Sequence, residues 1–121
     1  MAGNLFTTVL TPVAYTGNQE FSLALGRTTI VNLTSTGNVT IFGLFATGGN
    51  VDGMVVCLSN VNNSSLQFTG AHESVSASAA TNRFRNAGLT DVSGGTGAGC
   101  LWYRYNAAIS GGRWVMIGKT S

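Results

Sequence analysis

The sequence predicts an all-β fold, a β-sandwich or a jelly roll in one domain, and three observations lead to that prediction. Short apolar or alternating segments recur at spacings of about 8–12 residues, which is typical of such folds. Turn-forming residues separate them, and 17 of the 121 residues are glycine. No apolar period of about 3.6 residues lasts beyond one turn. Roughly eight to ten short strands would not remain one open sheet, so we expect two packed layers.

The C-terminal segment 99–118 is predicted to be the hairpin around which the core forms. It holds both tryptophans, Trp102 and Trp114, and aromatic side chains bury the most area per residue. Side chains alternate along a strand, so one face carries Leu101, Tyr103 and Tyr105 and the other carries Cys100, Trp102 and Arg104. We treat Trp102 and Trp114 as candidate structural or interface residues.

The other strands are predicted from alternation and from β-branched residues between turns. They are residues 5–10, 20–25, 28–33, 39–42, 44–46, 54–58, 66–69 and 83–85. The turn at 35–38 predicts that 28–33 and 39–42 form a hairpin. The continuous apolar run at 54–58 predicts a strand buried on both faces. We expect an ordered loop with one helical turn at 70–81, and a glycine-rich loop at 93–99.

The chain is predicted to form a single domain, because 121 residues bury a core without covalent staples. Residues 1–26 are expected to supply an N-terminal arm and the first strands, and residues 27–121 the remainder of the sandwich. Leu5 and Phe6 are candidate contact residues of the arm. The alternative is that this arm is merely the first strand of the sandwich.

The composition indicates a protein that works by contact with neighbours. Only 8% of the residues are charged, and the net charge of +2 is spread singly along the chain. No basic cluster exists, which argues against a nucleic-acid partner. There is no apolar run of about 18 residues and no basic leader before an apolar stretch, so we expect no membrane partner and synthesis in a cytoplasm. A neutral surface of Thr, Ser, Asn and Gly suits packing against other subunits.

No catalytic residue is predicted. His72, Glu73 and Ser74 are sequence neighbours, which does not place them as a hydrolytic triad, and no Gly-x-Ser-x-Gly turn is present. The ending Gly118-Lys119-Thr120 lacks the first glycine of a phosphate-binding loop, because position 113 is an arginine. We therefore expect no cofactor.

The two cysteines, Cys57 and Cys100, are predicted to be buried, reduced thiols that pack as small hydrophobes. A disulfide between facing strands is the alternative. With a single histidine, His72, elsewhere in the chain, they make no metal-binding pattern.

Arg83 stands between a serine-rich loop and a short strand and is a candidate structural residue together with Glu73. A guanidinium donates up to five hydrogen bonds, so we expect Arg83 to hold the loop through its carbonyls or through Glu73. A contact to a neighbouring subunit is the functional alternative.

Several segments taken together resemble β-domains of tailed-phage virions, found in small capsid decoration (cement) proteins and in the C-terminal parts of tail fibres. They are TTIVNLTSTGNVTIFGL at 28–44, Leu66-x-Phe68, His72-Glu73-Ser74, Ala80-x-Asn82-Arg83-Phe84, Leu101-x-Tyr103-x-Tyr105 and Arg113-Trp114. The resemblance covers about residues 27–117. Family versions often carry Tyr-Asp where this chain has Tyr105-Asn106, which removes a carboxylate.

The resemblance implies a jelly-roll-like antiparallel β-sandwich that assembles as a homotrimer and binds other virion proteins or a host surface. Because only about 25 residues precede the matching part, we expect a capsid decoration protein that binds the major capsid protein on the virion surface, without catalysis. A tail-fibre or receptor-binding module, with exposed Tyr or Trp for glycans, is the alternative.

Overall fold

The computed structural model describes residues 5–10, 20–23, 25, 27–35, 37–61, 66–73 and 79–120. Nearly all regular structure in this part of the chain is β, which confirms the all-β prediction. Two single 3-10 turns, η2 (Ala80–Asn82) and η3 (Ala87–Leu89), flank β8. The strands are β1 (Leu5–Leu10), β2 (Glu20–Leu23), β3 (Thr28–Leu33), β4 (Val39–Ile41), β5 (Gly43–Ala46), β6 (Val55–Asn60), β7 (Gln67–Gly70), β8 (Phe84–Arg85), β9 (Val92–Thr96), β10 (Cys100–Asn106) and β11 (Arg113–Thr120).

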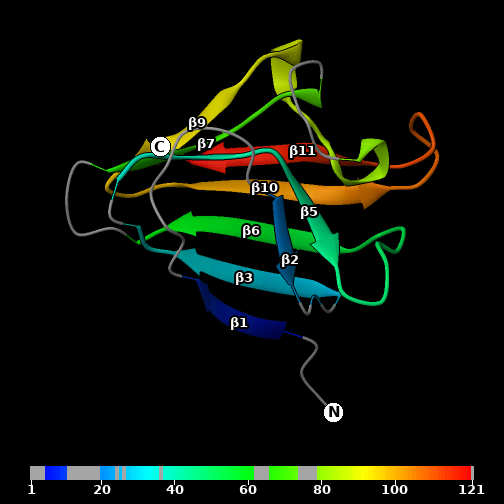
Figure 1. Ribbon diagram of the computed structural model, residues 1–121, viewed down its shortest axis with the longest axis horizontal. Coiled ribbons are helices and arrows are strands. Elements are labelled where there is room, and N and C mark those ends of the chain that lie inside the picture. The colour runs from blue at the N-terminus through cyan, green and yellow to red at the C-terminus, as the bar shows by residue number, and fades with distance from the viewer. Residues whose placement is uncertain are drawn as a thin grey trace.

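The strands form one large sheet and a second layer that crosses it (Figure 1). The large sheet has six strands in the order β1-β3-β6-β10-β11-β8. The second layer consists of the pair β2-β5 and the three strands β4-β7-β9. Only Phe42 separates β4 from β5, so one nearly continuous segment links the two parts of this layer.

Between β1 and β10 the chain passes back and forth between the two layers, and this makes many ladders parallel. The chain passes from β1 to β2, back to β3, out through β4 and β5, and returns as β6. Neighbours in the large sheet are then separated by a strand of the other layer, so β1, β3 and β6 all run parallel. The pairs β2-β5, β4-β7 and β8-β11 are parallel as well. The expectation of an antiparallel, jelly-roll-like sandwich is wrong for these pairs, because a jelly roll is built from antiparallel Greek keys.

The hairpin predicted for residues 28–33 and 39–42 does not form. β3 pairs with β1 and β6 in the large sheet, whereas β4 pairs with β7 in the other layer. The alternating pattern of the two segments is kept, because both bury their apolar side chains in the same core from opposite layers.

The C-terminal hairpin forms as predicted. β10 and β11 pair antiparallel, with a register shift between Trp102 and Tyr103. Leu101, Tyr103 and Tyr105 are buried, and the side chains between them are half-buried. β10 also pairs with β6, which places the hairpin next to the centre of the large sheet.

Rows of buried side chains cross the large sheet and make its inner face. Val31, Leu58 and Leu101 lie side by side on β3, β6 and β10, and Thr29, Val56 and Tyr103 form the next row. Across the core lie Val39, Ile41, Leu44 and Phe68 of the second layer. In β6, residues 56–58 are all buried, as the apolar run predicted for a central strand.

The glycine-rich segment 93–99 was expected to be a loop, but its first part is strand β9. β9 pairs antiparallel with β7. Gly94 permits this, because an added Cβ there would lie 2.6 Å from the ring of Phe68. A glycine inside a strand commonly marks such a close approach. The helical turn expected within 70–81 is η2, while residues 74–78 lie outside the described part of the chain.

Candidate functional site

The two candidate tryptophans occupy different environments. Trp114 is fully buried, and its Nε1 donates a hydrogen bond to the carbonyl of Leu44 at 3.0 Å. Its ring meets Tyr105 edge-on, with centroids 5.1 Å apart. Tyr105 donates its hydroxyl to the carbonyl of Thr81. Trp114 is thus a structural residue that joins β11 to the second layer, while Trp102 is half-buried on the opposite face of β10.

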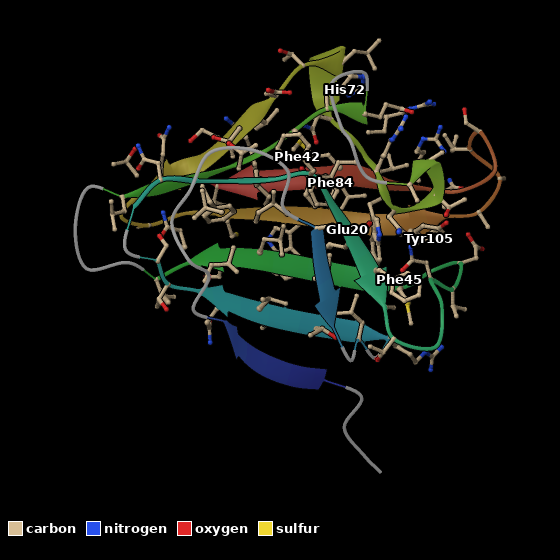
Figure 2. All side chains as sticks on the ribbon, in the orientation of Figure 1. Glu20, Phe42, Phe45, His72, Phe84 and Tyr105 are labelled. Atoms are coloured by element: carbon tan, nitrogen blue, oxygen red, sulfur yellow. The ribbon has the colours of Figure 1, made fainter. Side chains whose placement is uncertain are left out.

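Asn86 is the centre of a buried polar network at the end of the molecule where His72 lies (Figure 2). Its Nδ2 donates to the carbonyls of Gly70 and Thr90, and its Oδ1 accepts the hydroxyl of Tyr103 at 2.7 Å. Every polar atom of this side chain therefore has a partner, as buried polar groups require. Tyr103 stacks on Phe84 with centroids 4.3 Å apart. Burial raises the pKa of the Tyr103 phenol, and the charge of Asp91 raises it further.

His72 belongs to the same network, and its hydrogen bonds are structural. Its Nδ1 accepts a hydrogen bond from the backbone N–H of Asn86 at 3.3 Å, which leaves Nε2 to carry the proton of a neutral ring. Its own N–H donates to the Asp91 carboxylate at 2.8 Å. That carboxylate therefore orients the His72 backbone rather than the imidazole, unlike the acid of a hydrolytic triad.

Glu73 is held by two guanidinium groups from different strands. Arg85 Nε donates to one carboxylate oxygen at 2.5 Å, and Arg113 Nε donates to the other at 2.6 Å. Burial raises the pKa of this carboxyl, but the two arginines lower it more, so that the pKa falls from 4.5 to about 2. The carboxylate is thereby committed to a structural clamp between β8, β11 and the segment after β7.

Two other arginines make the clamp on Glu73, while the pairing of the Arg83 side chain with Glu73 stays a prediction. The guanidinium groups on Glu73 are those of Arg85 and Arg113. The backbone of Arg83 makes the connection instead: its carbonyl accepts the N–H of Trp114 at 3.0 Å, and it bridges to Gly43 of β5. Donation by its side chain to loop carbonyls remains a prediction.

The N-terminal candidates Leu5 and Phe6 belong to β1, an edge strand of the large sheet. They pair with Thr28 and Thr29 of β3. The described part of the arm is therefore the first strand of the sheet, which was the alternative interpretation. The remainder of residues 1–26, apart from Glu20–Leu23 and Leu25, lies outside the described residues.

Both cysteines are free thiols, as predicted. Cys57 is buried, whereas Cys100 is half-buried, so the prediction of burial was wrong for Cys100. Burial, together with a smaller contribution from neighbouring Cys100, raises the pKa of the Cys57 thiol to about 12. A thiol in that state is a poor nucleophile.

A groove that no sequence pattern predicted lies along the outer edge of β11. The groove has a volume of about 460 Å³ and is lined by Ala87, Val92, Met116, Ile117, Gly118 and Lys119. It lies beside residues 116–120 of β11, because β8 pairs only with Trp114 and Val115. After Arg85 the chain turns away into η3. No local sequence pattern predicts where β8 ends, because its length is set by parallel pairing with β11, which is distant in the sequence.

A second hollow of similar volume lies between the β5–β6 connection and Arg27, lined by Arg27, Val51, Asp52, Gly53 and Met54. One oxygen of Asp52 accepts the N–H of Ala107 at 2.9 Å. That bond ties this loop to the β10–β11 turn, so Asp52 has a structural use here.

Within the described residues, no group of three or more His, Cys, Asp or Glu side chains is placed to hold a metal ion. The same part of the chain contains no helix of the length and apolarity that crossing a membrane demands. Comparison with protein-family models, with curated proteins and with solved structures finds no match to this chain.

Proposed function

We propose that this chain is a structural virion protein that decorates a phage head and stabilises its lattice by adhesion, as a homotrimer and without substrate turnover. The resemblance of residues 27–117 to virion β-domains motivates the proposal. The all-β architecture supports it at the level of fold class.

The proposal rests on one observation: the buried polar and charged side chains are paired with one another inside the protein, whereas several large apolar side chains are exposed. The carboxylate of Glu73 is paired with the guanidinium groups of Arg85 and Arg113, and the buried His72 and Asn86 are hydrogen-bonded internally. Large apolar side chains are exposed instead, at Phe45, Val51, Val61, Leu89 and Ile117. With 8% charged residues, such a surface binds through hydrogen bonds and apolar contacts, which salt weakens little.

Trimeric assembly gives such a small domain enough affinity. One copy offers a modest contact patch, but three linked copies make the later contacts intramolecular and raise the avidity without new chemistry. Closed cyclic symmetry also lets each copy bury one side against its neighbour.

Reconstitution of heads tests this function. Heads stripped of the protein, or made without its gene, should lose resistance to heat and regain it when folded wild-type protein is added, at both 50 mM and 500 mM salt. Heat-unfolded protein is the matched control and should restore nothing. If stripped heads are equally robust while adsorption to cells is lost, the receptor-binding alternative replaces the decoration function.

A further inference from the structure

Within the described residues, the large sheet has two edges that no further strand covers completely. On one side, β8 covers only Trp114 and Val115 of β11, and within the described residues no other strand lies beside 116–120 on that side. The groove lined by Ala87, Val92 and Met116 runs along this stretch. Ile117, in the same stretch, is 56% exposed. An open edge presents unpaired N–H and C=O groups that pair readily with another strand.

The opposite edge is β1. It pairs with β3 along all six of its residues and is the end strand of the described sheet. Its sequence, LFTTVL, contains no charge and no proline. Natural edge strands usually carry such residues to prevent association with other chains. Among the described strands, none pairs with the outer side of β1, and β1 is about as long as the exposed part of β11.

The two edges have matching directions. β1, β3 and β6 are parallel, β10 is antiparallel to β6, and β11 is antiparallel to β10. β11 consequently runs parallel to β1. A rotation about an axis along the strands keeps the direction of every strand, so it brings β1 of one copy beside β11 of the next as a parallel pair.

We propose that residues 116–120 of β11 bind β1 of a second copy of this chain, so that the large sheets join head to tail in a closed ring. Pairing of β11 with β11 of another copy about a two-fold axis would leave every β1 edge open, whereas the head-to-tail contact covers both edges. The groove beside Met116 lies along the stretch where the incoming strand pairs. The contact concerns self-assembly and does not depend on binding to a phage head.

Cross-linking between engineered cysteines tests which edges meet. In a background of Cys57→Ala and Cys100→Ser, one preparation carries Thr8→Cys and another carries Gly118→Cys, where an added Cβ meets no atom within 4 Å. A short bis-maleimide should link the mixed preparations into a heterodimer and leave each alone unlinked. The double variant should give closed covalent rings. A product from Gly118→Cys alone, or no product at all, overturns the proposal.

Substitution at the edge gives a second test. Ile117→Lys places a charge on the open edge and should reduce the mass in solution to that of a monomer, measured by light scattering at micromolar concentration. Val51→Lys is the matched control, because Val51 is equally exposed (56%) but lies in the β5–β6 connection. A monomeric wild type, or equal masses for both variants, contradicts the proposal. Should Ile117→Lys fail to fold, the cross-linking experiment still shows whether β1 and β11 of different copies meet.

Discussion

At the scale of single residues, Glu73 joins three segments of the chain. Its two oxygens accept hydrogen bonds from Arg85 on β8 and Arg113 on β11. Charge-assisted pairs of this kind are roughly twice as strong as neutral hydrogen bonds. The side chain of Glu73 is 14% exposed, so the pairs are screened less than surface ion pairs.

The low pKa of Glu73 makes the stability of the protein depend on pH. Its folded pKa, about 2, lies below the unfolded value of 4.5, so its contribution is present above pH 4.5 and is lost as the pH falls toward 2. Glu73→Gln should therefore lower the free energy of unfolding by about 2 kcal/mol at pH 7 and much less near pH 2. Urea unfolding at both pH values measures this.

Glu20→Gln is the control for that experiment. Glu20 accepts a neutral amide, Asn82 Nδ2, at 2.7 Å, and a glutamine oxygen preserves this bond. The control should keep the free energy of unfolding at pH 7 close to that of the wild type. Equal losses at pH 7 and pH 2 for Glu73→Gln would mean that the clamp is not electrostatic.

The sequence could indicate that Glu73 pairs with an arginine, but not which one. Arg83, Arg85 and Arg113 are all candidates by residue type. The choice depends on the ladder that sets Phe84 beside Trp114 and Arg85 beside Val115. That ladder joins segments about thirty residues apart, and no local pattern encodes its register.

At the scale of elements, two glycines let strands approach side chains closely. Gly70 ends β7 beneath Tyr103, and Gly94 lies in β9 against Phe68. The sequence around Gly94 predicted a loop, because glycine is common in turns. The close approach that explains Gly94 in a strand is visible only once the two layers are packed.

Gly70→Ala should destabilise the protein by about 1–3 kcal/mol, because its Cβ would lie 2.5 Å from the Tyr103 hydroxyl and displace it from Asn86. Gly118→Ala is the matched control within a strand, since nothing lies within 4 Å of its added Cβ. Thermal unfolding of both variants measures the difference. Equal melting temperatures would show that Tyr103 moves aside without cost.

Strand positions were largely predictable from alternation, whereas strand partners were not. The C-terminal hairpin was predicted correctly, because its strands are close in sequence and joined by a clear turn. The segments 28–33 and 39–42 carry similar signals, yet they pair in different layers. Alternation of apolar and polar residues shows which side chains of a strand face the core. The same pattern fits two strands paired in one sheet and two strands that face each other from opposite layers.

At the scale of the whole molecule, alternation of the chain between layers produces parallel neighbours in the large sheet. The parallel ladders of β1, β3 and β6 each require the chain to pass through the other layer. The large sheet consequently ends in β1 on one side (Figure 1) and in the short β8 on the other. These edges and the weakly charged surface suit a subunit that acts within an assembly.

The measurement that tests the central claim most directly is the location of the protein on purified phage particles. Gold-labelled antibodies against the folded domain, viewed by electron microscopy, should mark the head surface in many copies per particle. Particles made without the gene for this chain are the control and should carry no label. Label at the tail tip with bare heads would contradict the decoration function and favour receptor binding, and label on neither would contradict a role in the virion.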